Sequence, residues 1–224
     1  MSSGGAPGCG SEAAQAPDDV VRVLRRLQER YPEAGTRLHF EDRFQLLVAV
    51  VLSAQSTDVQ VNRVTRRLFS LYRRPQDFAA LEPAQLEPLV KGCGLYRAKA
   101  RAIVGLSRAL LERHGGQVPD SFEELLRLPG VGRKTANVML SVGFDRPGLG
   151  VDTHVLRVSR RLGWHRCQGA NAAEMALKAL VPREWWSRAH HLLIAHGRAV
   201  CLARRPRCQG CPVRSDCPSA TEQG

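Results

Sequence analysis

Apolar residues recur at the spacing of an amphipathic helix along most of the chain. The first stripe consists of Val20, Val21, Leu24 and Leu27, and it ends before the break at Pro32. The same periodicity, interrupted by Gly and Pro, predicts further helices over residues 42–53, 58–72, 83–91, 96–113, 121–127, 133–143, 153–162, 171–180 and 184–201. Alternating β-branched residues, which favour strands, are scarce. The pattern therefore predicts an all-α fold.

The charge balance points to an anionic partner. The 224 residues include 33 Lys or Arg and 21 Asp or Glu, which gives a net charge of +12 and a pI near 10.1. Nucleic acid is the usual partner of so basic a chain, and a generally solvated basic surface is the alternative. Only four basic residues are lysines: Lys91, Lys99, Lys134 and Lys178. Because Arg stays protonated, chemistry that needs a neutral amine would need one of these four.

No apolar run is long enough to cross a bilayer. The longest, FQLLVAVVL from Phe44 to Leu52, has nine residues and is typical of a core helix. Residues 1–17 are rich in Gly, Ala and Ser and contain no hydrophobic signal region, so we expect a disordered tail and an intracellular protein. In that setting the seven Cys favour metal binding over a disulfide framework.

The segment LPGVG, from Leu128 to Gly132, links two predicted helices by a turn short enough to require a tight helical hairpin. Gly130 and Gly132 permit positive φ and leave backbone N–H groups uncovered. Such donors at a helix N-terminus suit an anion such as a DNA phosphate, with Arg133 beside them. A plain helix–helix turn is the alternative. The net charge and the order hydrophobic–Pro–Gly–hydrophobic–Gly favour a helix-hairpin-helix DNA-binding element.

A lysine and an aspartate follow this turn, 18 residues apart. Lys134 lies in the first helical turn, where the positive end of the helix dipole disfavours a second positive charge, so its amine is a candidate nucleophile. A phosphate-contacting or solvated lysine is the alternative. Asp152, in VDTHV, is placed to cap the next helix, and a capping carboxylate stays ionised and can stabilise a cation or accept a proton. His154 is a lesser candidate, for which packing or hydrogen bonding competes with a DNA contact.

Four C-terminal cysteines form the most specific pattern in the chain. Cys201, Cys208, Cys211 and Cys217 are spaced C-x6-C-x2-C-x5-C, which indicates a metal or cluster site. Zinc is the alternative, but its sites more often contain two CxxC pairs.

The loop between the first two of these cysteines is basic. Arg204, Arg205 and Arg207 lie there and are candidates for phosphate contacts. The other cysteines, Cys9, Cys93 and Cys167, are scattered, and we expect them to be ordinary thiols.

Several motifs together carry a family resemblance. VLSAQSTDVQVN, LPGVGRKTANV, VDTHV and HGRAVC, combined with the Cys spacing, resemble the endonuclease III family of DNA glycosylases over residues 18–217. The resemblance implies a two-lobed helix-hairpin-helix glycosylase fold. A six-helix barrel would span 36–146, with the hairpin element at about 121–143. A four-helix domain would combine 18–35 with 147–224 and hold a [4Fe-4S] cluster on the four C-terminal cysteines.

The resemblance also implies a mechanism. The damaged nucleotide would be flipped out of the duplex, because its C1′ cannot be reached inside the stack. Lys134 would then attack C1′ and displace the base, while Asp152 supports the positive sugar and takes part in proton transfer. The resulting Schiff base would allow β-elimination, which cuts the strand 3′ to the lesion.

Two further residues match positions that fill the vacated stack in the family. Gln55, in SAQST, would insert beside the orphaned base, and Leu95, in GCGLYRAK, would wedge the base step. The alternatives are that Gln55 caps the helix beginning at 58 and that Leu95 belongs to the core. Asp58 would help to hold the partner strand.

The implied function is a bifunctional DNA glycosylase and abasic-site lyase that removes oxidised pyrimidines from duplex DNA in base excision repair. A pyrimidine-dimer-specific glycosylase/lyase and a catalytically silent iron–sulfur damage scanner are the alternatives. Adenine-mispair relatives lack the lysine and carry a further C-terminal domain, so Lys134 and the short segment after Cys217 count against that activity. We expect a monomer that binds damaged duplex DNA and no membrane, in the cytoplasm of a bacterium, associated with the nucleoid.

Overall fold

A computed structural model describes residues 16–220 of the chain. Within this range the chain forms helices and loops and no strand, which confirms the all-α prediction. The chain divides into two compact units, a central unit from Thr36 to Gly148 and a terminal unit from the segments before and after it. Of the tail expected at 1–17, residues 1–15 lie outside the described part, and Pro17 already begins the first helix.

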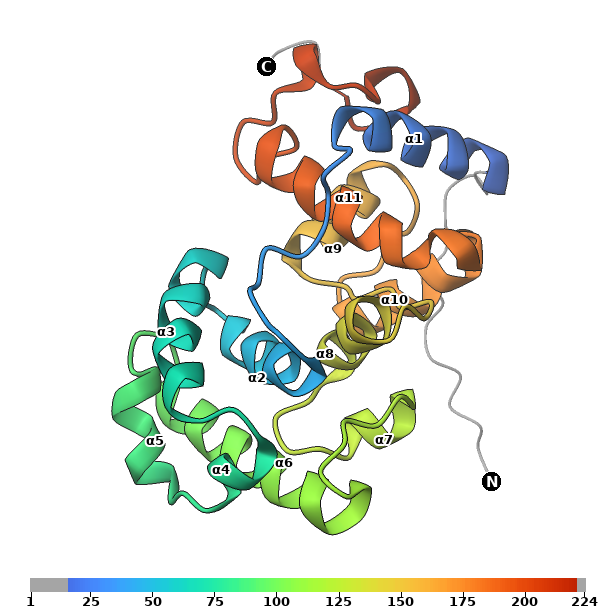
Figure 1. Cartoon of the computed structure of the whole chain (residues 1–224). Coiled ribbons are helices and arrows are strands. Elements are labelled where there is room, and N and C mark those ends of the chain that lie inside the picture. The colour runs from blue at the N-terminus through green and yellow to red at the C-terminus, as the bar shows by residue number, and fades with distance from the viewer. Residues whose placement is uncertain (1–15, 221–224) are drawn as a thin grey trace, which may run out of the picture. The chain divides into compact units, whose positions relative to one another are not determined.

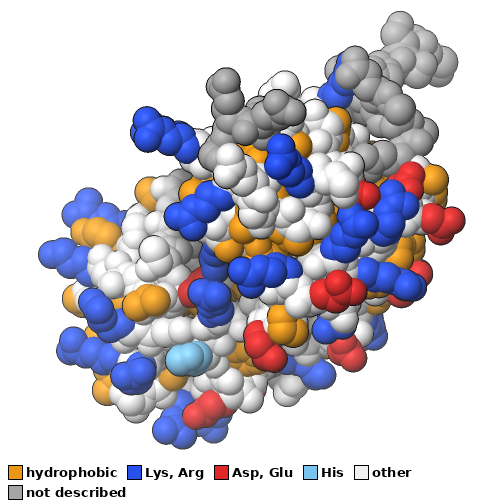
Figure 2. All heavy atoms as spheres, turned by 90° about the horizontal axis from the view of Figure 1, so that it is seen from above, with side chains coloured by type: hydrophobic (Ala, Val, Ile, Leu, Met, Phe, Trp, Pro, Cys, Tyr) orange, Lys and Arg blue, Asp and Glu red, His pale blue; other side chains and the backbone are white. Residues whose placement is uncertain are grey.

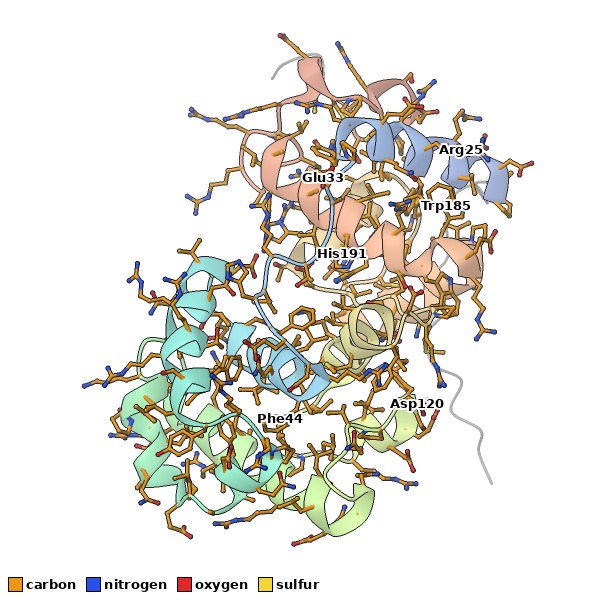
Figure 3. All side chains as sticks on the ribbon, viewed as in Figure 1. Arg25, Glu33, Phe44, Asp120, Trp185 and His191 are labelled. Carbon is orange, nitrogen blue, oxygen red and sulfur yellow. The ribbon has the colours of Figure 1, made fainter. Side chains whose placement is uncertain are left out.

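The central unit contains seven α-helices in the described chain, one of which is buried among its neighbours (Figure 1). That helix is α2, whose FQLLVAVVL run is buried throughout, as the sequence predicts, and it packs against α3, α6 and α8. Phe44, labelled in Figure 3, lies at its start and contacts Phe78 edge-on, with ring centroids 5.4 Å apart. The helices are α2 (Arg43–Ser53), α3 (Asp58–Leu71), α4 (Pro75–Ala79), α5 (Pro83–Val90), α6 (Tyr96–His114), α7 (Phe122–Leu126) and α8 (Arg133–Val138).

The terminal unit is built from both ends of the chain. Its helices α1 (Pro17–Arg30), α9 (Thr153–Arg161), α10 (Ala170–Leu180) and α11 (Trp186–Ala199) enclose a second apolar core. The predicted stripe of α1 contributes Val20, Leu24 and Leu27 to that core, with Val23 in place of the expected Val21. After α11 the chain continues as a loop with two short 3₁₀ turns, Cys208–Gly210 and Arg214–Asp216. None of the described helices is both long and apolar enough to cross a membrane.

Two local features differ from the predicted helices. The short α4 was not expected, because five residues are too few to show a helical period; Pro75 begins it and Asp77 accepts hydrogen bonds from the N–H groups of Arg73 and Arg74, each 2.9 Å. The helix expected over 133–143 changes at Val138 into a π-helix over Met139–Gly143. The loop that follows crowds this segment, since a Cβ at Gly148 would lie 2.2 Å from the carbonyl oxygen of Asn137.

Candidate active site and metal centre

The predicted helical hairpin is present and is seated on α6. α7 ends at Leu126, α8 begins at Arg133, and the turn between them buries Leu128 and Val131. Gly130 has φ +77°, and a Cβ there would lie 2.5 Å from the Cβ of Ala102 on α6. The turn therefore needs glycine at this position for both its backbone and its close approach.

Gly132 differs from its prediction. It caps α8 with φ −98° and ψ 177°, an extended conformation open to any residue, so only Gly130 uses a positive φ. The reason is that one left-handed residue completes the turn, after which the chain enters the helix directly. Both glycines are exposed, which leaves the backbone of the turn accessible.

Lys134 is the second residue of α8 and is partly buried. Its neighbour Arg133 lies with its guanidinium 5.0 Å from the ring centroid of Phe122 on α7, a cation–π contact that ties the two helices together. Asn137, fully buried, donates a hydrogen bond of 3.0 Å to the carbonyl oxygen of Arg133. The hairpin thus presents its lysine from a backbone that is fixed on both sides.

Asp152 caps α9 in the terminal unit, as its position in the sequence predicts. Its Oδ1 accepts hydrogen bonds from the backbone N–H groups of His154 and Val155, each 2.8 Å. Its Oδ2 accepts no hydrogen bond from any residue between 16 and 220. One carboxylate oxygen therefore fixes the side chain, and the other remains for a ligand.

His154 packs beside α11. Its Nδ1 lies 3.1 Å from Nη2 of Arg157, and the same guanidinium donates to the carbonyl oxygens of Gly197 and Cys201 at 2.9 and 3.1 Å. Burial lowers the pKa of His154, and Arg157 contributes in the same direction, while Asp152 opposes them. These contacts give His154 a clear packing role, the alternative kept open by the sequence.

Gln55 and Leu95 are exposed residues of the central unit with unusual backbones. Their φ values are +53° and +59°, in the left-handed region that is costly for side chains other than glycine. The helix-cap alternative for Gln55 is wrong, because Thr57 caps α3 through its hydroxyl, 3.3 Å from the N–H of Gln60. The core alternative for Leu95 is also wrong, since the residue is 59% exposed. Asp58 is the first residue of α3 and is partly buried.

A residue that the motifs missed lies beneath these two positions. Lys99 is buried in α6, and its Nζ donates to the carbonyl oxygens of Leu52 and Ala54 and to the Ser56 hydroxyl, at 2.8, 2.6 and 3.1 Å. The sequence does carry a signal for it, because Lys99 is in register with the buried Ile103 and Leu106 on the apolar face of its helix.

The four C-terminal cysteines line a single cavity in the terminal unit, together with apolar Val158, Leu162 and Val213. Burial is the main cause that raises the pKa of the Cys211 and Cys217 thiols, and the neighbouring cysteines of the set add to it. A bound cationic centre offsets this penalty, because metal binding stabilises the thiolate form. The donor set therefore fits a thiolate-bound metal group. The described residues contain no group of three or more His, Cys, Asp or Glu at the spacing of a single metal ion.

Arginines of α9 hold the segment that starts this loop. Arg161 donates to the carbonyl oxygens of Leu202 and Ala203, at 2.6 and 3.0 Å, and lies 3.3 Å from Sγ of Cys201. The sequence does not predict this role, because nothing in the spacing links α9 to residues 201–203. The helix capped by Asp152 therefore also supports the first cysteine.

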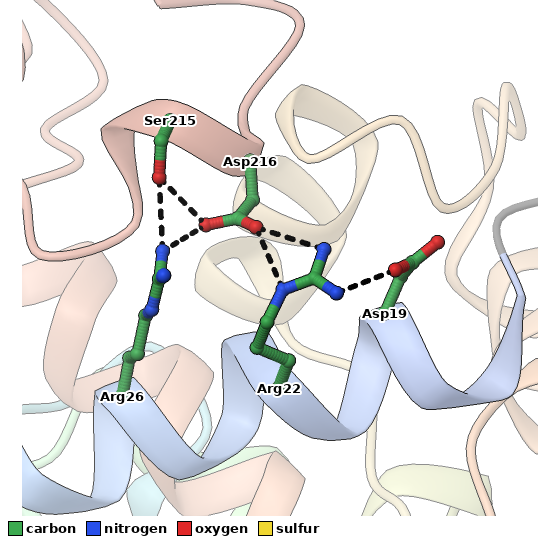
Figure 4. Close-up of polar contacts among 5 residues, drawn as sticks. All are labelled: Asp19, Arg22, Arg26, Ser215 and Asp216. Carbon is green, nitrogen blue, oxygen red and sulfur yellow. Dashed lines mark hydrogen bonds and ion pairs between the residues drawn. The ribbon is translucent and has the colours of Figure 1, made fainter.

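The other end of the loop is tied to α1 through Asp216 (Figure 4). Its Oδ1 accepts from Nε and Nη2 of Arg22 at 3.2 and 3.1 Å, and its Oδ2 accepts from Arg26, which also donates to Ser215 at 2.9 Å. Asp19 in turn accepts from Nη1 of Arg22 at 2.7 Å. The side chain of Asp216 is only 11% exposed, so α1 encloses the residue next to the last cysteine.

The arginines of the basic loop are exposed, and the remaining cysteines differ from one another. Arg204, Arg205 and Arg207 are all exposed, and on the face shown in Figure 2 the visible charged side chains are mostly Lys and Arg. Cys9 lies outside the described residues, and Cys93 is a buried thiol. Cys167 is disulfide-bonded, so the expectation of an ordinary thiol is wrong there. Sequence spacing does not show which thiols meet in space.

Comparisons with known proteins agree with this geometry. Residues 48–183 match the model of the HhH-GPD superfamily of base excision DNA repair proteins. The chain is 48% identical over 195 residues to Endonuclease III of Bacillus subtilis, covering 87% of this chain and 89% of the relative, and 42% identical over 197 residues to that of Escherichia coli K12, covering 88% and 93%.

A solved structure of a trapped Endonuclease III–DNA covalent intermediate, an estranged-adenine complex, superposes with a TM-score of 0.86 at 43% identity. It covers 92% of this chain and 97% of that one, and a non-covalent Endonuclease III–DNA complex matches with a TM-score of 0.85. The hairpin, the cysteine loop and these matches lead to one conclusion: the chain belongs to the endonuclease III family of the HhH-GPD superfamily of base excision DNA repair proteins.

Proposed function

We propose that this protein is a bifunctional DNA glycosylase and abasic-site lyase that removes oxidised pyrimidines from duplex DNA. The observation that carries the proposal is Lys134, held at the start of α8 directly after the hairpin turn. A relative that forms a covalent intermediate with DNA, as the matched structure's name states, needs a nucleophile, and a lysine amine can be one.

We assign the steps of the reaction to two residues, Lys134 and Asp152. The Lys134 amine attacks C1′ of the damaged nucleotide, a C–N bond to the enzyme forms, and the bond from C1′ to the base breaks as the base leaves. Asp152 stabilises the positive sugar through its Oδ2 and takes part in proton transfer. Ring opening gives a Schiff base on Lys134, and loss of the proton at C2′ then expels the 3′ phosphate by β-elimination.

Several other residues bind the DNA. The exposed backbone of Gly130 and Gly132, with Arg133, contacts a phosphate next to the lesion. Gln55 inserts beside the orphaned base and Leu95 wedges the base step, since both side chains project from exposed, left-handed positions. Asp58 helps to hold the partner strand, and the exposed Arg204, Arg205 and Arg207 contact phosphates, while His154 keeps its packing role.

The four cysteines would hold a [4Fe-4S] cluster, as the family's spacing implies. When bound, the cluster supplies four iron–thiolate bonds that fix the loop, and a centre capable of redox change. The chain's own part is to bring Cys201, Cys208, Cys211 and Cys217 to one cavity and to present the intervening arginines to DNA. With this activity, the protein would act in the cytoplasm of a bacterium, on the DNA of the nucleoid.

The test compares lesions in one duplex sequence under single-turnover conditions. We expect nicking at thymine glycol, little at a cyclobutane pyrimidine dimer and none in undamaged DNA. Lys134→Gln should abolish nicking and leave DNA binding within about three-fold of wild type, since the substitution removes one cation among many. The exposed Lys91→Gln is the matched control.

Each contrary result has a distinct meaning. Preferential nicking of the dimer would replace the proposed substrate by dimers. Salt-sensitive binding with no cleavage of any lesion would identify a protein that only scans DNA.

A further inference from the structure

Lys99 is a buried cation to which the proposed mechanism assigns no step. It is 5% exposed, and lysines are rarely buried without a partner of opposite charge. Within residues 16–220 it forms no ion pair with Asp or Glu. Its three acceptors are the carbonyl oxygens of Leu52 and Ala54 and the hydroxyl of Ser56. The ammonium group therefore donates hydrogen bonds to one short segment, residues 52–56, instead of pairing with a carboxylate.

That segment is the end of α2 and the loop that carries Gln55. The last carbonyl groups of a helix have no partner within the helix, and a cation suits the negative end of the helix dipole. Lys99 provides both a hydrogen-bond donor and a positive charge there, because its acceptor Leu52 lies in the last turn of α2 and its acceptor Ala54 directly follows the helix. Ala54 directly precedes Gln55, whose φ of +53° is unfavourable without support from its surroundings.

The same contacts reach the loop that carries Leu95. Ser56 accepts a hydrogen bond of 3.2 Å from the N–H of Gly94 while its hydroxyl also meets Lys99. Gly94 approaches so closely that a Cβ there would lie 3.3 Å from the carbonyl oxygen of Gln55. The Lys99 ammonium and the Ser56 hydroxyl therefore join two loops that are about 40 residues apart in the chain. They hold the left-handed residues Gln55 and Leu95 side by side in the central unit.

Burying the Lys99 ammonium costs desolvation free energy. Burial lowers the pKa of Lys99, and the nearby Cys93 thiol partly opposes that change. Cys93 itself is fully buried, and its side chain interacts with Ser56. A solvated lysine would avoid this desolvation, so its three hydrogen bonds must offset the cost.

We infer that Lys99 is a positioning residue that pre-organises Gln55 and Leu95 for insertion into the DNA stack at the lesion. The inference rests on the proposed function, because it assumes that these two side chains replace an extruded nucleotide. Lys99 itself does not touch DNA. Pre-formed loops reduce the ordering cost at the moment of insertion, so the effect should appear in extrusion of the damaged nucleotide.

The decisive variant is Lys99→Met, which keeps an unbranched apolar stem and removes all three donors. Single-turnover excision of thymine glycol paired with adenine should fall by about 10- to 100-fold, since small displacements of positioning groups cost this much. Nicking at a preformed abasic site within a mismatched bubble needs no extrusion and should change by less than about three-fold. Lys91→Met, an exposed lysine of the same unit, removes the same charge and should change neither rate.

A fluorescent readout separates positioning from general loss of structure. In the Lys134→Gln background, 2-aminopurine placed opposite the lesion should brighten on binding when the stack is disturbed, and Lys99→Met should remove most of that increase. An equal loss of excision and abasic-site nicking, or an unchanged fluorescence increase, would overturn the inference.

Ser56→Ala gives an independent check if Lys99→Met does not fold. It removes the hydroxyl shared by Lys99 and Gly94, and it should produce the same split between the two substrates with a smaller amplitude. Equal effects on both substrates would again contradict the inference. Failure of wild-type protein to excise thymine glycol would refute the proposed function instead, so the two failures are distinguishable.

Discussion

The two units hold their functional loops by different means. In the central unit, the Gln55 loop, the Leu95 loop and the hairpin turn rest on a large apolar core and on hydrogen bonds within the unit, with Lys99 and Gly130 at the close contacts. In the terminal unit, residues 201–217 contribute only Val213 to the buried core among the described residues. Charged side chains of α1 and α9 and four thiols support that loop instead.

This difference shows that one fold can stabilise one loop by packing and hydrogen bonds within the chain and another loop by a bound metal group. Loss of a polar contact such as that of Lys99 displaces a loop that rests on a core, but the helices beneath the loop stay folded. A loop that depends on thiolates keeps its shape only while the metal group is bound.

Asp152→Asn separates the chemistry of the terminal unit from its stability. Asn caps helices about as well as Asp, so unfolding free energy should change by less than about 1 kcal/mol. Loss of the charge should lower the single-turnover excision rate by about 10²- to 10⁴-fold. Asp42 caps α2 in the same manner, accepting from the N–H of Gln45 at 2.8 Å. Asp42→Asn is therefore the matched control, and an equal loss of activity in both variants would contradict a catalytic role for Asp152.

Loss of the metal group should unfold the cysteine loop and spare the central unit. Cys211→Ser removes one of the four thiols that line the cavity. Hydrogen–deuterium exchange should then rise over residues 200–217 and stay low in α2 and α6, because structural metal sites contribute several kcal/mol to local folding. The visible absorbance of the cluster should fall in parallel. Increased exchange spread evenly over both units would remove the contrast between them.

Acid should destabilise the terminal unit through His165, which is only 1% exposed. Its Nδ1 accepts from the N–H of Cys167 at 3.1 Å and its Nε2 lies 2.8 Å from Ser159, so a second proton would break the first bond. Burial lowers the pKa of His165 to about 4, below its unfolded value of 6.5. Stability is therefore complete above pH 6.5 and is lost as pH falls towards 4, by up to about 3 kcal/mol.

Urea unfolding at pH 7 and pH 5 measures this difference. His165→Gln should reduce the loss of stability between the two pH values, while the exposed His39→Gln should leave it as in wild type. An unchanged pH dependence in His165→Gln would assign the acid sensitivity to other groups.

The ion pairs of α1 should give the smallest effect. Arg26→Ala removes one of the two arginines that bind Asp216 and should lower the unfolding free energy by about 0.5–1 kcal/mol, since the pair is partly exposed. Arg25 lies on the same helix and its side chain is exposed (Figure 3), so Arg25→Ala is the control. Equal melting temperatures of both variants would show that the loop does not depend on this contact.

The sequence predicts best those features that local chemistry determines. The hairpin turn follows from Pro129 and Gly130, and the cap of α9 follows from Asp152, because both depend on residues adjacent in the chain. The left-handed backbones of Gln55 and Leu95 do not follow, since neither is glycine and both depend on contacts with distant loops. The burial of Lys99 is an intermediate case: its position on the apolar face of α6 predicts burial, but its contacts with Leu52 and Ala54 depend on the packing of α6 against α2.

Borohydride trapping on a duplex with one thymine glycol tests the central claim most directly. Reduction of a Schiff base fixes the protein to the DNA, so wild-type protein should give a covalent adduct whose yield requires the damaged base. Lys134→Gln should give none, and Lys91→Gln should give the wild-type yield. An adduct of undiminished yield in Lys134→Gln would contradict the assignment of the amine at the start of α8 as the nucleophile.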